Sequence, residues 1–161
     1  MTTESGATMR FLPLGLDIRG KICLVVGGGS VGTRKAMTLA RAGATVTVVS
    51  PVVTAELAEQ IRAGRIRWVE GQFRDEHVHG VFLAVAATDD EALNATVARA
   101  AGELGALVCD SSSAERSQVI FGAVLESDEA TIAVFTDGRN PAQARRTRDR
   151  IAGFIAAERK V

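Results

Sequence analysis

The sequence predicts an α/β fold in which helices cover both faces of a parallel β-sheet, and three observations support this prediction. A short apolar segment, Ile22 to Val26, runs directly into a glycine-rich turn and then into a helical pattern. Strand-like and helix-like segments then alternate as far as residue 109. After residue 119, two strand-like segments follow each other without a helix between them. Together these features are typical of a Rossmann-like sheet followed by a small β-hairpin and a C-terminal helix.

The glycine-rich turn carries the most specific local signal. Gly27, Gly29 and Gly32 have the G-x-G-x-x-G spacing directly after the strand-like segment. In such a turn the first glycine permits the tight bend, the second lets the backbone approach a pyrophosphate, and the third lets the helix pack closely on the strand. The free N–H groups at the start of the helix favour an anion. We therefore expect a dinucleotide here, and a glycine-rich turn that binds nothing is the alternative.

The composition indicates one main globular domain. Of the 161 residues, 47% are hydrophobic and 24% are charged. The longest apolar stretch, Val81 to Ala87, is far too short to cross a membrane, and residues 1–10 lack the pattern of a signal peptide. We expect a cytoplasmic protein without membrane contact, in which Cys23 and Cys109 are buried free thiols.

The charge pattern argues against nucleic acid as a partner. The 19 basic residues equal the 19 acidic residues in number, so the formal net charge at pH 7 is zero. Basic residues gather from Arg139 onward, but no aromatic residue stands among the arginines between Arg139 and Arg150. Such a run most often marks a solvated helix, with an anion-binding face as the alternative.

The first half of the chain reads as strands and helices in alternation. The helix after the glycine turn is expected from about Ser30 to about Ala42, where Gly43 ends it. The segment TVTVVS, residues 45–50, then forms a second strand, parallel to the first because a helix connects them. Three further segments follow: a helix over 52–63, a strand over 65–70 and a polar connection over 72–80.

The second half starts with the same alternation and then departs from it. We expect a strand over 81–87, a helix capped by Thr88 to Glu91 and ending at about Glu103, and a strand over 105–109. Residues 119–125 and 131–135 predict an antiparallel hairpin. The last helix begins at Pro141, with Asn140 as its cap. We assign 1–115 to a nucleotide-binding domain and 116–161 to a hairpin and helix segment.

Four segments carry a resemblance to a known family. They are FLPLGLDIRGKICLVVGGGSVGTRKA, AGATVTVVSP, LAVAATDDEALN and IFGAVLESDEATIAVFTDGRNPAQARRTRDRI. With their A-A-T-D-[DE]-x-x-x-N and N-P-x-x-A-R-R-x-R motifs, they resemble the precorrin-2 dehydrogenase/sirohydrochlorin ferrochelatase family, the N-terminal module of siroheme synthases. This resemblance implies NAD-dependent oxidation of precorrin-2 to sirohydrochlorin, sometimes followed by insertion of ferrous iron, in a homodimer.

The predicted cofactor is NAD rather than NADP. The second strand ends in Val49-Ser50-Pro51, where an acidic residue usually holds the adenine ribose, and no arginine follows that would hold a 2′-phosphate. The resemblance matches Ser30 and Val31 to loop positions that contact the cofactor. The candidate cofactor-binding residues are Gly27, Gly28, Gly29, Ser30, Val31, Ser50, Pro51, Val52, Ala87 and Thr88.

The candidate catalytic residues are Asp110 and Ser113. Where the family carries an aspartate after the fifth strand, this sequence reads Cys109-Asp110-Ser111-Ser112-Ser113, and a one-residue gap places Ser113 at the matching position. A serine is no carboxylate base near neutral pH, so Asp110 is the better candidate. Family members also usually continue into a C-terminal helical module, and this sequence stops at Val161. The alternative is therefore a catalytically weak or silent NAD-binding homologue that acts as a sensor or partner subunit.

The tetrapyrrole substrate carries acetate and propionate groups, which arginine side chains bind well. The candidate substrate-binding residues are Arg116, Arg139, Arg145 and Arg146, each with a solvated surface position as its alternative. His77 and His79 form an H-x-H pair in a polar segment, which we interpret as an exposed turn and not as a metal site.

A homodimer through residues 118–157 is the expected assembly. The hairpin cannot extend a parallel sheet by a crossover, and the final helix has a thin apolar stripe that requires a packing partner. A two-fold pair is the commonest closed oligomer. A monomer whose helix folds back on its own sheet is the alternative.

Overall fold

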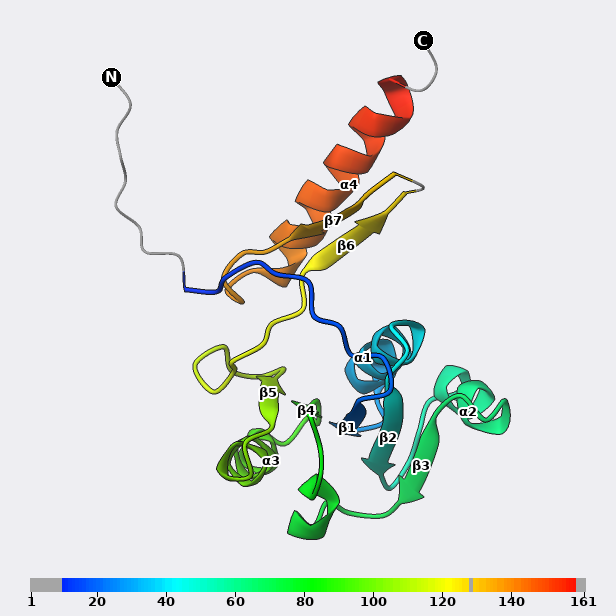
Figure 1. The fold of residues 1–161 in the computed structure, drawn as a ribbon, viewed down its shortest axis with the longest axis vertical. Helices are drawn as coiled ribbons and strands as arrows, with labels where there is room; N and C mark the ends of the chain where they lie inside the picture. Colours follow the sequence, from blue (N-terminus) through cyan, green and yellow to red (C-terminus); the bar gives the residue numbers. More distant parts are fainter. Residues whose placement is uncertain (1–9, 128, 159–161) are drawn as a thin grey trace. The chain divides into compact units, whose positions relative to one another are not determined.

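A computed structural model of the chain describes residues 10–127 and 129–158. The chain forms two compact units: one is Gly15–Val119, and the other joins the described residues up to Leu14 to the segment that begins at Ile120 (Figure 1). The prediction for the N-terminal tail lies outside the described residues, apart from Arg10. In the described part of the chain, no helix combines the length and the apolar character that a membrane span requires.

The larger unit contains a five-stranded parallel sheet in the order β3-β2-β1-β4-β5. Its strands are β1 (Ile22–Val26), β2 (Thr45–Ser50), β3 (Arg67–Glu70), β4 (Leu83–Ala86) and β5 (Leu107–Asp110). The chain adds strands on one side of β1 and then crosses to the other side with β4, so β1 and β4 flank the point where the topology switches. In such open sheets, ligands bind outside the carboxyl ends of the strands at this point.

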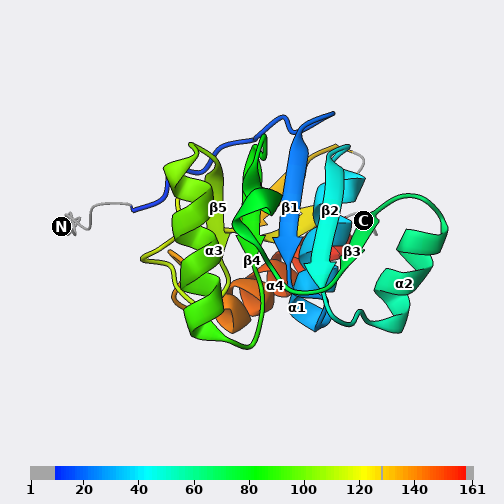
Figure 2. The same ribbon diagram turned by 90° about the horizontal axis from the view of Figure 1, so that it is seen from below.

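Helices lie on both faces of this sheet, as the sequence predicts (Figures 1 and 2). The helices are α1 (Ser30–Arg41), α2 (Ala55–Arg62) and α3 (Glu91–Glu103), and a single 3₁₀ turn, η1 (Asp75–Val78), lies between β3 and β4. Helices α1 and α2 cover one face, whereas η1 and α3 cover the other. The predicted Rossmann-like sheet is thus confirmed.

Several predicted elements are longer than the observed ones. The strands predicted over 65–70, 81–87 and 105–109 begin two residues later, and Ile66 and Ala106 are buried although they precede the paired residues. The helix predicted over 52–63 begins at Ala55, since the Thr54 side chain accepts a hydrogen bond from the Leu57 N–H and caps the first turn.

The apolar strand residues alternate between the two faces and fill both sides of the sheet. Leu24, Val49 and Val108 join the cluster beneath α3, where Val97 is also buried. The two cysteines are buried and free, as predicted. Burial raises the pKa of Cys23 to about 11, so its thiol stays protonated and packs as a small apolar group.

The smaller unit consists of an antiparallel hairpin and a long helix. Strands β6 (Ala123–Glu126) and β7 (Thr131–Val134) pair with each other, and α4 (Pro141–Glu158) packs along both (Figure 1). The predicted cap is confirmed, because Asn140 Oδ1 accepts a hydrogen bond of 2.9 Å from the Gln143 N–H. Residues 119–122, which we expected in the first hairpin strand, lie outside it.

Candidate functional site

The turn between β1 and α1 has a backbone that only glycine permits at two positions of the motif. Gly27 has a φ of +115°, and a Cβ there would lie 2.3 Å from the Ala87 carbonyl oxygen. A Cβ on Gly32 would lie 1.9 Å from the Gly27 carbonyl oxygen. These glycines are therefore required by the packing of the protein itself, in the roles that the motif predicts.

Gly29 differs, because the protein places no atom within 4 Å of a Cβ built on it. It is the N-cap residue of α1, where no side chain caps the helix and no acidic residue lies in the first turn. Ser30 and Val31 are the first residues of α1, so their N–H groups have no acceptor within the helix and lie at the positive end of its dipole. This cradle, which a side chain at Gly29 would fill, fits the pyrophosphate of a dinucleotide.

Ser50, at the end of β2, fixes the glycine turn from the side. The Ser50 Oγ accepts a hydrogen bond of 2.9 Å from the Gly28 N–H and donates one of 2.7 Å to the Val52 carbonyl oxygen. The side chain is buried, so it positions the turn from within the protein. Pro51 and Val52 are exposed beside it, and Val52 is 74% exposed, which offers an apolar surface to an adenine ring.

Asn94 organises the loop after β4, and the sequence analysis did not assign it to the site. Its Oδ1 accepts hydrogen bonds of 3.0 Å from the Thr88 N–H and 2.7 Å from the Thr88 hydroxyl. Its Nδ2 donates to the Thr88 carbonyl oxygen and to Ser112 Oγ, so it joins the β4 and β5 loops. The signal for this role was present, because Asn94 ends the A-A-T-D-[DE]-x-x-x-N motif and lies on the buried face of α3.

Asp110, at the end of β5, is a buried carboxylate whose two oxygens accept hydrogen bonds from neighbouring residues. Oδ1 accepts from the Ser112 N–H at 2.8 Å and from Ser112 Oγ at 2.6 Å, and Oδ2 accepts from Arg116 Nε at 2.6 Å. Burial raises the pKa of Asp110, but the hydrogen bonds from Ser112 and Arg116 and the charge of Arg116 outweigh it, so the pKa is lowered overall. Asp110 is ionised at neutral pH and holds Arg116 in place.

The Arg116 guanidinium contacts two carboxylates. Besides Asp110, it lies 3.3 Å from Glu91 Oε1 at the start of α3, and one third of its side chain remains exposed. The hydrogen bond to Asp110 raises the pKa of Arg116 further. Ser113 lies in the same loop and is half-buried, and its Oγ accepts a hydrogen bond of 3.4 Å from the Arg116 N–H. The structure thus brings Asp110, Ser113 and Arg116 together.

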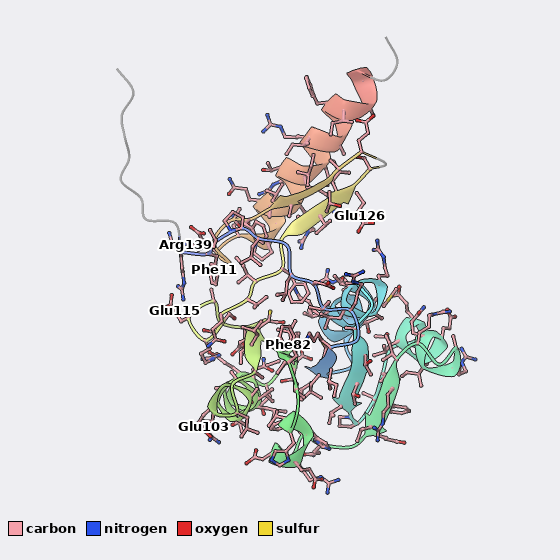
Figure 3. The ribbon with its side chains drawn as sticks, in the orientation of Figure 1. Phe11, Phe82, Glu103, Glu115, Glu126 and Arg139 are labelled. Carbon is pink, nitrogen blue, oxygen red and sulfur yellow. The ribbon has the colours of Figure 1, made fainter. Side chains whose placement is uncertain are left out.

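The other three candidate arginines belong to the smaller unit. Arg139 is exposed in the turn before α4 (Figure 3), and Arg145 and Arg146 are exposed on the first turns of that helix. His77 Nδ1 accepts a hydrogen bond from the Arg74 N–H within the 3₁₀ turn. Among the described residues, no group of three or more histidine, cysteine or acidic side chains gathers in a way that could hold a metal ion.

Comparison with known proteins identifies the family to which this chain belongs. Residues 14–123 match the family described as "Putative NAD(P)-binding". The structure named "SirC, precorrin-2 dehydrogenase" superposes with a TM-score of 0.79 and 31% sequence identity, over 89% of this chain and 70% of that chain. This chain belongs to the precorrin-2 dehydrogenase family. The family resemblance stated from the sequence is therefore confirmed.

Siroheme synthases are also similar to this chain. The protein from Azotobacter vinelandii is 42% identical over 92% of this chain, and the protein from Stutzerimonas stutzeri is 40% identical over 92%. The siroheme synthase from Photorhabdus laumondii is 35% identical over 91% of this chain. This chain spans only 31% to 32% of the length of these relatives.

Proposed function

We propose that this chain binds NAD and dehydrogenates precorrin-2 to sirohydrochlorin. The observation that carries the proposal is the match to the SirC precorrin-2 dehydrogenase along nine tenths of the chain, at 31% identity. The open cradle at Gly29 supports the cofactor part of the proposal, because it offers backbone N–H donors to a pyrophosphate.

The residues that hold the cofactor in this proposal follow the carboxyl edge of the sheet. Ser30 and Val31 bind the pyrophosphate through their N–H groups, and Pro51 and Val52 border the adenosine. Ala87 and Thr88 lie after β4, where the nicotinamide half is expected. Bound NAD supplies the hydride acceptor, and the protein supplies binding and orientation.

The loop after β5 supplies the charged groups of the proposed site. Arg116 binds a carboxylate of the tetrapyrrole through the exposed part of its guanidinium, while Asp110 holds it in position. On the smaller unit, the exposed side chains of Arg139, Arg145 and Arg146 are the candidates for binding tetrapyrrole carboxylates. The proton released on dehydrogenation passes to Asp110 or to water, and we propose Asp110 ahead of Ser113 because only a carboxylate is basic at neutral pH.

A homodimer through the smaller unit completes the proposal. Large apolar side chains of this unit are exposed, among them Leu12 at 70%, Leu14 at 63% and Phe154 at 66%. A hairpin and one helix provide too little cover for such side chains, and a second copy of the unit would bury them. Light scattering at micromolar concentration is expected to give twice the mass of one chain, and the mass of a single chain would contradict the dimer.

One observation favours the alternative of a silent NAD-binding homologue. Both oxygens of Asp110 accept hydrogen bonds inside the protein and its pKa is lowered, which makes it a weak base. A spectrophotometric assay with precorrin-2 and NAD distinguishes the two functions. We expect sirohydrochlorin to form, whereas NAD binding without turnover would leave the silent homologue.

The Gly29→Val variant tests the cofactor site itself. Its side chain meets no protein atom within 4 Å of the Cβ, so the variant is expected to fold and to lose NAD binding by calorimetry. A folded Gly29→Val protein with the NAD affinity of the parent would refute the proposed cofactor site. Asp110→Asn and Ser113→Ala, assayed side by side, then assign the proton acceptor, and we expect only the former to lose activity.

A further inference from the structure

The adenosine side of the proposed cofactor site has no acidic residue at the end of β2. In related folds a carboxylate at this position holds the ribose hydroxyls and disfavours a 2′-phosphate. Here the position is Ser50, whose hydroxyl is bonded to the Gly28 N–H and the Val52 carbonyl oxygen, and which is only 6% exposed. The hydroxyl that the sequence offers to the ribose is therefore already engaged within the protein.

The neighbouring strand places a carboxylate at the same level of the sheet. In the parallel pairing of β2 and β3, Ser50 is in register with Glu70, and each is the last residue of its strand. Adjacent strands lie about 4.8 Å apart, so the two residues are direct neighbours at the carboxyl edge. The first half of such a sheet, β1 to β3, is the half over which adenosine binds.

The direction of Glu70 follows from the alternation of its strand. Val69 packs against the cluster that contains Val49, on the face that α3 covers. Because successive residues of a strand point to opposite faces, Glu70 lies on the same face as Ser50, towards α1 and α2. Glu70 is exposed, and in the described part of the chain no ion pair is formed with its carboxylate.

The backbone around Glu70 is tied to the end of β2. Trp68 Nε1 donates a hydrogen bond of 2.9 Å to the Ser50 carbonyl oxygen, and the Gly71 N–H donates one of 3.3 Å to the same oxygen. These two contacts flank Glu70 in the chain. They hold its backbone beside the position from which the ribose is normally bound.

We infer that Glu70 replaces the missing acidic residue of β2, accepts hydrogen bonds from the ribose hydroxyls of NAD and selects against NADP. This inference rests on the proposed binding of a nicotinamide dinucleotide. Two ribose hydroxyls are donors that suit a carboxylate, whereas a 2′-phosphate brings a charge of nearly −2 next to it. The residue thus determines cofactor specificity without touching the reacting atoms.

Trp68 allows this inference to be tested by binding alone. It is the one tryptophan of the chain, and its indole N–H contacts Ser50 beside the adenosine position. Titrations of the full chain with NAD⁺ and with NADP⁺, followed by Trp68 fluorescence and by calorimetry, give both dissociation constants. We expect the parent to bind NAD⁺ at least about tenfold more tightly than NADP⁺, a ratio that corresponds to one charged contact.

Glu70→Gln keeps the size of the side chain and removes its charge. We expect NADP⁺ affinity to rise and NAD⁺ affinity to fall, so that the preference for NAD⁺ over NADP⁺ shrinks to about twofold or less. Glu70→Arg is expected to reverse this preference. Glu59→Gln, an exposed glutamate on α2, is the matched control and should keep the parent ratio. Circular dichroism verifies that each variant is folded.

The outcomes separate this inference from the proposed function. If the parent discriminates between the two dinucleotides and Glu70→Gln discriminates equally well, or if the parent does not discriminate, Glu70 has no such role while the dinucleotide site stands. If the parent binds neither dinucleotide, the proposed function fails and the inference fails with it.

Discussion

The turn after β1 and the loop after β5 both follow the carboxyl end of a parallel strand, yet they are built from different groups. The β1 turn consists of glycine backbone, with Gly27 against Ala87 and Gly32 against Gly27, and it leaves the N–H groups of α1 open. The β5 loop consists of charged and polar side chains, in which Asp110 and Arg116 bond to each other.

The two loops differ in whether charged side chains of the protein itself are present and paired. The β1 turn carries no side-chain charge at its cradle and therefore offers its dipole and donors to an anion from outside. In the β5 loop the carboxylate of Asp110 and the guanidinium of Arg116 largely satisfy each other, and this fixes the loop before any ligand arrives. We therefore expect the first loop to be sensitive to carbon atoms added at Gly27 and Gly32, and the second loop to be sensitive to loss of the polar groups that bond to Asp110.

Gly32→Ala is expected to have the largest effect on stability. Its Cβ would lie 1.9 Å from the backbone oxygen of Gly27, which has no flexible side chain to move aside. The variant should lose more than about 3 kcal/mol of unfolding free energy in urea denaturation. Gly29→Ala adds the same methyl group in open space at the same turn and should change stability by less than about 1 kcal/mol. Equal stability of the two variants would contradict the backbone packing of this turn.

Asn94→Ala has the second-largest expected effect on stability, because it removes the side chain that links the β4 and β5 loops. The side chain is 1% exposed and makes four hydrogen bonds to Thr88 and Ser112, whose partner atoms would be left unsatisfied. We expect a loss of about 2 to 3 kcal/mol in denaturant unfolding. Thr96→Ala, on the exposed face of the same helix, is the control and should stay within about 0.5 kcal/mol of the parent.

Asp110→Asn tests the charge pairing of the β5 loop through the pH dependence of protein stability. The variant leaves Arg116 paired with Glu91 alone, and since a third of the arginine side chain is exposed, we expect the free energy of unfolding to fall by about 2 kcal/mol at pH 7. The pKa of Asp110 is lowered in the folded state, so its ionised form stabilises the protein above the unfolded pKa of about 4, and this contribution is lost as the pH falls towards the lowered folded pKa.

Unfolding curves between pH 3 and pH 7 check this prediction. The difference in stability between the parent and Asp110→Asn should be constant above about pH 5 and shrink below about pH 4. Asp89→Asn, an exposed carboxylate at the β4 loop, serves as the control and should run parallel to the parent. A difference that does not change with pH would contradict the charge pairing of Asp110.

Thr54→Ala has the smallest expected effect on stability and tests the side-chain cap of α2. Thr54 Oγ1 caps α2 by accepting from the Leu57 N–H and lies 2.8 Å from Thr33 Oγ1 on α1. Removing this hydroxyl should cost about 1 kcal/mol in thermal or denaturant unfolding. Thr54→Ser keeps the hydroxyl and should restore most of that stability, and a Ser variant as weak as Ala would exclude the cap as the cause.

Local patterns were sufficient for the elements whose physical cause is local. The glycine spacing after an apolar strand predicts the turn and α1, and Asn140 before Pro141 predicts the start of α4, because capping and φ preferences act within a few residues. The ends of the strands were less well predicted. Hydrophobic character predicts which residues are buried, but not which residues pair with a neighbouring strand. Val81 and Phe82, for example, are partly buried and do not belong to β4.

The sequence by itself determined the order of strands and helices, the glycine turn and the family, since these depend on short motifs and on periodicity. The tertiary structure decided which distant residues meet at the edge of the sheet: Glu70 beside Ser50, Asp110 against Arg116 and Glu91, and Asn94 between Thr88 and Ser112. These neighbours are set by lateral strand order and register, which arise from the packing of the whole sheet. No local pattern in the chain contains them, because strand pairing joins segments by position in space and not by distance along the sequence.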